Sequence, residues 1–114
     1  MQPSFMNDVG VLTDYVTETI AELGRSYAVV EIAMDADRRY RVGVSMTYSY
    51  GGFGSAPSVD GESFSTYTQA LDAGIAMLLR KWHTPLPGDP ASVREELSQL
   101  HEQVLSRQRQ PTLF

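Results

Sequence analysis

Cysteine is absent from this chain of 114 residues. Its absence excludes disulfides, iron–sulfur clusters, thiolate zinc sites and a cysteine nucleophile, and it is compatible with a cytoplasmic protein. No apolar run approaches the roughly 18 residues that a membrane-spanning helix requires. The N-terminal residues also lack the basic and long apolar stretches of a signal peptide. We therefore expect a cytoplasmic protein that has no membrane partner.

Positive charge is scarce as well. The chain has 9 lysine and arginine residues against 14 aspartate and glutamate residues, which gives a net charge of −5. Strong electrostatic binding to nucleic acid depends on a concentration of positive charge, so this balance argues against it. A hydrophobic content of 42% is ordinary for a folded protein, and the length suits one small globular domain with a single core.

Motifs that carry catalysis are missing. The chain has 2 histidines, His83 and His101, and neither belongs to a His-x-x-x-His or Glu-x-x-His pattern that would bind a metal. There is no Gly-x-Ser-x-Gly elbow, and the glycines of residues 51–54 lack the Lys-Ser/Thr pair of a phosphate-binding loop. We therefore predict a protein that is not an enzyme and holds no cofactor and no metal. A pair of catalytic carboxylates without a motif is the remaining alternative.

The first part of the chain carries the spacing of a helix. Apolar residues recur three or four positions apart: Val9, Leu12, Val16, Ile20 and Leu23. This spacing predicts a helix over residues 8–23. Asn7 is expected to cap its N-terminus, and Gly24 suits the left-handed position after its C-terminus.

From Ser26 the pattern changes to a period of two, which is typical of strands. One predicted strand buries the even-numbered residues of 28–34, and the next buries those of 40–50, with a polar turn at residues 35–38. The other face of the second strand is expected to be wet and carries Arg41, Ser45, Thr47 and Ser49. Residues 51–61 are predicted to form a loop, and a short third strand at residues 62–64 is an open alternative.

Two further helices are predicted. Thr66 and Gln69 have the spacing of a capping box, and Ala70 and Gly74 allow the helix that follows to approach the sheet closely. Asp89 and Pro90 are expected to open the last helix. Its apolar stripe is narrow and consists of Val93, Leu97, Leu100 and Val104. Such a stripe packs along a seam, either on the domain's own sheet edge or on a second copy of the chain, and we favour a homodimer.

These elements predict an α+β fold. The expected order is a helix, an antiparallel β-hairpin, a helix and a protruding C-terminal helix. We assign residues 1–88 to an α+β core domain, 89–107 to the C-terminal helix and 108–114 to an exposed tail.

The arginines at the predicted hairpin form one candidate contact surface. Arg38, Arg39 and Arg41 lie close in sequence, and aromatic residues stand near the glycine-rich loop. Arginines interleaved with aromatics can bind single-stranded nucleic acid. A single-stranded nucleic-acid-binding module is therefore our alternative function, although the neighbouring aspartates reduce the local positive charge.

The sequence Gln110-Pro111-Thr112-Leu113-Phe114 resembles the peptide with which bacterial replication and repair proteins bind the sliding clamp, commonly Gln-Leu-Ser/Asp-Leu-Phe. Gln110, Leu113 and Phe114 match the positions that matter most in that family. The resemblance implies that Gln110 forms hydrogen bonds beside the clamp's groove and that Leu113 and Phe114 fill an apolar pocket. The alternative is that Leu113 and Phe114 fold back onto the domain.

Our leading hypothesis is therefore a small non-enzymatic accessory, adaptor or inhibitor protein of the kind found in phages and mobile elements. It would act by protein–protein binding and dock on the bacterial sliding clamp through Gln110, Leu113 and Phe114.

Overall fold

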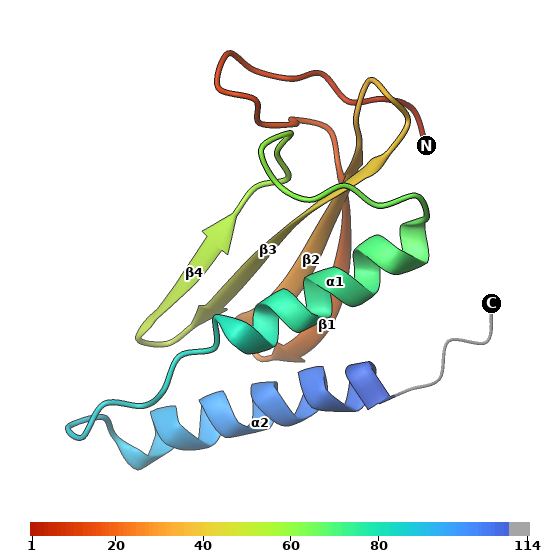
Figure 1. The fold of residues 1–114 in the computed structure, drawn as a ribbon. Helices are drawn as coiled ribbons and strands as arrows, with labels where there is room; N and C mark the ends of the chain where they lie inside the picture. The colour runs from red at the N-terminus through yellow and green to blue at the C-terminus, as the bar shows by residue number, and fades with distance from the viewer. Residues whose placement is uncertain (110–114) are drawn as a thin grey trace.

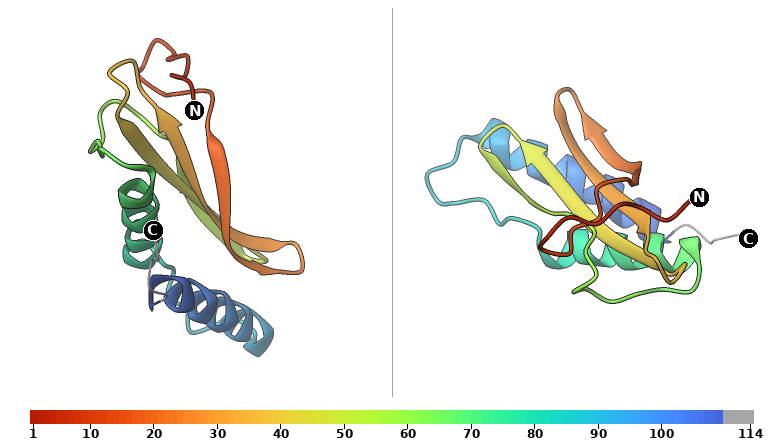
Figure 2. Two further views of the ribbon diagram at one scale, coloured as in Figure 1. Left: turned by 90° about the vertical axis from the view of Figure 1, so that its right-hand side faces the viewer. Right: turned by 90° about the horizontal axis from the view of Figure 1, so that it is seen from above.

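The fold is a four-stranded antiparallel sheet followed by two helices (Figure 1), and the computed structural model describes residues 1–109. The strands are β1 (Val16–Leu23), β2 (Ser26–Met34), β3 (Tyr40–Tyr48) and β4 (Gly51–Ser55), and they neighbour one another in chain order. The helices α1 (Tyr67–Arg80) and α2 (Ala91–Arg109) lie on the same side of the sheet (Figure 2). The core is formed between the sheet and these helices.

The helix predicted for residues 8–23 is wrong. Residues 16–23 form the edge strand β1, which pairs antiparallel with β2, and the residues before it form an irregular segment. Asn7 therefore caps no helix; its side chain instead accepts hydrogen bonds from the backbone N–H groups of Val9 and Val11 in a loop, both at 3.0 Å. The order is therefore β-β-β-β-α-α rather than helix, hairpin, helix, helix, although the class is still α+β.

The composition and pairing of β1 explain why the helical spacing misled. Four of the five residues from 16 to 20 are β-branched, and such side chains favour strands over helices. An irregularity between Thr19 and Ala21 shifts the register. Ile20 and Ala21 are consequently both buried in the core, so the apolar residues keep spacings of three and four within a strand.

The β2–β3 hairpin is confirmed. Met34 pairs with Tyr40 across the turn, and Val30 pairs with Val44 in the middle of the sheet. The Asp35 carboxylate accepts hydrogen bonds from the backbone N–H groups of Asp37 and Arg39 at 2.9 and 3.0 Å, which stabilises the turn as its polar residues predicted.

The loop predicted for residues 51–61 is in part a strand. Gly51–Ser55 forms β4, and Phe53 pairs with Met46 of β3. A Cβ at Gly52 would lie only 2.2 Å from the Met46 carbonyl oxygen, so the close approach of the two backbones requires glycine here. The short strand considered at residues 62–64 is reduced to one bridge between Phe64 and Tyr40.

Both helices pack into the core. The Thr66 side chain caps α1 by accepting the backbone N–H of Gln69, as predicted. A Cβ at Gly74 would lie 2.4 Å from Val30 Cγ1, which confirms the close approach of α1 to the sheet. The stripe proposed as a dimer seam is at most 3% exposed and belongs to the same core as the sheet: Val93, Leu97, Leu100 and Val104.

The last helix therefore does not protrude. Its narrow apolar stripe is buried against β1 and α1 of its own chain, so these residues form no exposed seam for a second copy. The sequence left two packing partners open for this stripe, the domain's own sheet and a second copy of the chain. In the structure the stripe packs on the domain's own sheet. The buried residues of α2 belong to the same core as those of the sheet and α1.

The second face of the sheet is only partly wet. At one end it is covered by the N-terminal segment and the loop after β4, where the Leu12 N–H donates to the Pro57 carbonyl and both residues are buried. Arg41 lies under this cover, whereas Thr47 and Ser49 are exposed as predicted. Ser45 lies between these extremes and is half-buried.

Candidate functional site

The hairpin arginines are largely engaged within the fold. Arg41 forms an ion pair with Asp35, with 2.8 Å between Nε and Oδ2, and its Nη1 donates to the carbonyls of Val59 and Gly61. Arg39 donates to Ser63 through Nε at 2.7 Å. Arg38 is exposed in the turn with a φ of 60°. The structure thus uses Arg41 to join β3 to the loop after β4, which leaves little clustered positive charge for a phosphate backbone.

The contacts of Arg41 also change the pKa of the Asp35 carboxyl group. Burial raises its pKa, but the hydrogen bonds from Arg41 and from the backbone of Arg39 and Asp37, with the charge of Arg41, outweigh burial. The net effect is a pKa below the ordinary value, so the carboxylate is charged at neutral pH. This ion pair links the turn after β2 to β3.

The residues of the clamp-binding resemblance lie outside the described residues. Gln110, Leu113 and Phe114 follow α2, whose described backbone ends at Arg109.

The edge of β1 is the first feature that the structure adds. The side-chain amide of Gln103 accepts from the Glu22 N–H at 2.9 Å and donates to the Glu22 carbonyl at 3.0 Å. Arg107 donates to the Thr19 carbonyl at 3.3 Å. Two side chains of α2 thus take the place of a neighbouring strand along the C-terminal half of β1 and protect that part of the edge.

Among residues 1–109, no side chain protects the N-terminal half of the β1 edge in this way. Thr17 and Thr19 lie two residues apart in β1 and pair with Glu31 and Val29 of β2, with no irregularity between them. In a strand, residues two positions apart direct their backbone groups to the same side. The Thr17 N–H and carbonyl therefore point outward like the Thr19 carbonyl. Within residues 1–109, no hydrogen bond to these two groups is found. In the described part of the chain, these two groups of Thr17 are therefore unpaired, and the residue is exposed.

A pocket with partly apolar walls lies at the start of β1, next to Thr17 in the sequence. It has a volume of about 370 Å³ and is lined by residues of the N-terminal segment and the start of β1: Met1, Gln2, Pro3, Phe5, Asp14, Tyr15 and Val16. Phe5 is 82% exposed and Val16 44%. A hydrogen bond to Glu31, the charge of Glu31 and burial together raise the pKa of Tyr15 at the rim of this pocket. Exposed apolar side chains around a hollow are typical of a contact surface.

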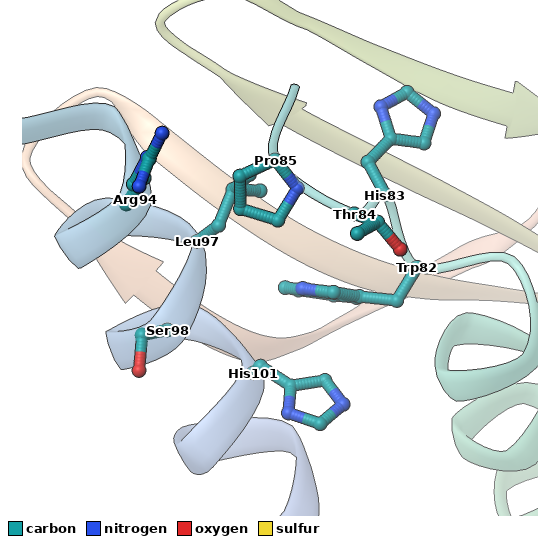
Figure 3. A pocket seen from close by; sticks show the side chains of 8 residues that line it. All are labelled: Trp82, His83, Thr84, Pro85, Arg94, Leu97, Ser98 and His101. Carbon is teal, nitrogen blue, oxygen red and sulfur yellow. The ribbon is translucent and has the colours of Figure 1, made fainter. Parts of the chain in front are cut away.

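A second pocket lies between α2 and the segment that follows α1 (Figure 3), with a volume of about 320 Å³. Its walls include Pro85, Leu97 and the rings of Trp82 and His101, whose centroids are 5.4 Å apart. Arg94 and Ser98 lie on the α2 side (Figure 3). The Trp82 Nε1 is buried and has no hydrogen-bond partner in the part of the chain that the structure describes.

His83 also lines this pocket, and its ring lies on the side of the sheet (Figure 3). Its Nδ1 lies 3.2 Å from the Tyr48 hydroxyl, and its ring centroid lies 5.3 Å from that of Phe53. The two histidines thus contact different aromatic rings: His101 contacts Trp82, whereas His83 contacts Tyr48 and Phe53. Among residues 1–109, no group of three histidine, aspartate or glutamate side chains is placed to hold a metal ion. No helix in the same range is both long and apolar enough to cross a bilayer.

Comparison of the chain with known protein families, with curated proteins and with solved structures finds no match. The candidate sites are therefore defined by geometry alone: the open β1 edge with its apolar pocket, and the pocket beside Trp82. Sequence reasoning missed both. One sequence signal for the first is Val16, which lines the pocket but belongs to the apolar stripe of the predicted helix.

Proposed function

We propose that this chain is a small accessory protein that acts by binding other proteins and that it receives an extended segment of its partner along the open edge of β1. Adding a strand to a free sheet edge is a common mode of peptide recognition, in which backbone hydrogen bonds give affinity and side-chain pockets give specificity. Both requirements are met at the same place on this molecule.

The observation that carries the proposal is the division of the β1 edge. Its C-terminal half is occupied by Gln103 and Arg107, whereas the outward groups of Thr17 are left unpaired among the described residues. Natural proteins protect exposed edges because an open edge pairs with other chains. An edge that is covered for half of its length and open beside an apolar pocket fits a binding surface.

The pocket defines the chemistry of the partner. A strand beside Thr17 would direct an apolar side chain toward Phe5 and Val16, and burying a side chain of that size contributes about 1.5–3 kcal/mol. The opposite edge, at β4, is rich in glycine, which has no side chain to pack against a partner. We therefore place the partner on β1 and expect an extended segment with alternating apolar residues.

A proline at position 17 tests this proposal. Thr17→Pro removes the outward N–H without removing a ladder hydrogen bond, and proline is tolerated where a strand N–H faces solvent. Thr17→Val keeps the N–H and the shape of the side chain, so it is the matched control. Peptides selected from a random display library on the unmodified protein provide the probe.

We expect the selected peptides to carry alternating apolar residues and to bind Thr17→Val as they bind the unmodified protein. Thr17→Pro should bind them about tenfold more weakly, because a backbone hydrogen bond and the room for the partner's carbonyl are lost. Equal binding by both variants, or a library that yields no enriched peptide, would contradict the proposal. Circular dichroism of both variants shows whether the sheet is intact.

The peptide at residues 110–114 offers a second contact in the same proposal. Its support is the match of Gln110, Leu113 and Phe114 to the clamp-binding peptide, so the proposed class is an accessory of bacterial DNA replication or repair. Two separate contacts on one small protein would let it join two partners, as an adaptor does.

A further inference from the structure

The pocket beside Trp82 has the properties of a small-molecule site and is independent of the strand-binding edge. It lies between the proline-containing segment after α1 and the first turns of α2. Its volume of about 320 Å³ falls within the range of roughly 300–1,000 Å³ that ligand pockets occupy. Mostly apolar walls with a few polar groups are also characteristic of such sites.

The walls favour a flat ring. The indole of Trp82 lies across the pocket, with Pro85 and Leu97 on one side and His101 on the other (Figure 3). The Trp82 and His101 planes meet at 52° rather than stacking in parallel. An aromatic ligand between the two inclined ring planes would contact both rings. Each aromatic pair contributes about 0.5–1.5 kcal/mol to the binding free energy beyond the effect of the buried area.

The polar groups favour a carboxylate. The chain has a net charge of −5, yet no aspartate or glutamate lines this pocket among the residues that the structure describes. Arg94 does line it and uses Nη2 for the Pro87 carbonyl at 3.1 Å. The remaining N–H groups of the guanidinium suit the two oxygens of a carboxylate, which arginine binds in a fork-like geometry.

The indole nitrogen of Trp82 provides a second donor. It is buried without an acceptor, which is costly for a polar group, and Figure 3 shows it on the side of the ring away from α1. Residues 84–88, which follow Trp82, are exposed, and a small displacement of this segment would open the nitrogen to a ligand oxygen. We propose that this pocket binds a small aromatic carboxylate, with the ring against Trp82 and the carboxylate on Arg94 and the indole N–H.

Trp82 is the chain's single tryptophan, so its fluorescence and its indole N–H resonance report on this pocket without labelling. The probes are phenylacetate and its uncharged isostere phenylacetamide. We expect saturable quenching or a spectral shift with phenylacetate and a downfield shift of the indole N–H resonance. Phenylacetamide should bind about tenfold or more weakly, since it lacks the charge that Arg94 recognises.

Arginine variants separate recognition from structural damage. Arg94→Gln should weaken phenylacetate about tenfold and leave the weak binding of phenylacetamide unchanged, whereas Arg38→Gln, at the distant β2–β3 turn, should change neither. If Arg94→Gln weakens both probes equally, the residue only holds the covering segment and the proposal fails. Equal binding of the two probes would assign the pocket to an uncharged group, such as an apolar side chain of a protein partner. No spectral change at about 10 mM phenylacetate, the weakest affinity expected for a ligand of this size, would also overturn the proposal.

Discussion

Replacing Gln103 by alanine should expose the protected half of the β1 edge and destabilise the protein. The side-chain amide of Gln103 forms two hydrogen bonds with the backbone of Glu22, at 2.9 and 3.0 Å. Each intramolecular hydrogen bond contributes about 0.5–1.5 kcal/mol net, and water can reach the freed groups because Glu22 is exposed. We therefore expect the free energy of unfolding to fall by about 1–2 kcal/mol.

Gln99→Ala provides the matched control on the same helix. Gln99 is exposed and its Nε2 donates to Glu95 at 2.9 Å, within α2 itself. Such a pair one helical turn apart contributes only about 0.2–0.5 kcal/mol, and both substitutions change helix propensity by the same amount. The difference between the two variants therefore isolates the contact with β1.

Urea denaturation of the two variants measures the predicted difference, and amide hydrogen exchange locates it. Gln103→Ala should accelerate exchange at the Glu22 N–H, whereas Gln99→Ala should leave that rate unchanged. Equal stability of the two variants, with an unchanged exchange rate at Glu22, would refute the assignment of Gln103 as a substitute for a neighbouring strand.

Three further outcomes are expected. Gly74→Ala should lower the free energy of unfolding, because the added Cβ would lie 2.4 Å from Val30 Cγ1. Overpacking of this kind costs about 1–3 kcal/mol, whereas the higher helix propensity of alanine gains about 1 kcal/mol. A higher thermal midpoint of the variant would contradict the observed packing. The pKa of Asp35 is lowered in the folded state, so its charged form stabilises the protein. This stabilisation is complete above the pKa of aspartate in the unfolded chain, about 3.9, and is lost as the pH falls through the pKa in the folded state. Asp35→Asn should therefore reduce stability by about 1.5–3 kcal/mol at pH 7, and urea titrations at pH 7 and below pH 4 should show the difference from the unmodified protein shrinking with acid. Purified bacterial sliding clamp should bind the unmodified protein in a surface plasmon resonance assay and should not bind a variant with Leu113 and Phe114 changed to alanine; equal binding by the two would remove the clamp from the proposal.

The β2–β3 hairpin could be predicted because its pattern has only one reading. The residues from Tyr40 to Met46 alternate between apolar side chains and small or polar ones, which fits a strand, and the polar turn fixes its register against β2. The N-terminal strand could not be predicted in the same way. Val16, Ile20 and Leu23 have a spacing that fits a helix equally well, and only the irregularity after Thr19 reconciles it with a strand.

The candidate sites depend on contacts that periodicity does not encode. Gln103 meets Glu22 across 81 positions in the sequence, so no local pattern identifies it as a substitute for a strand. β4 was missed because glycine has a low intrinsic preference for strands, although Gly52 is required by the approach of Met46. Trp82 lies two residues beyond the end of α1, and the burial of its unpaired nitrogen depends on tertiary packing that no local pattern encodes.

Hydrogen exchange at the Thr17 amide, measured with and without a selected peptide, tests the strand-binding function most directly. In the free protein this N–H faces solvent and should exchange fast, whereas the Glu22 N–H is bonded to Gln103 and should exchange slowly. Saturation with the peptide is predicted to slow exchange at Thr17 and to leave Glu22 as it was. Peptide binding that leaves the Thr17 amide exchanging at its free rate would contradict the account.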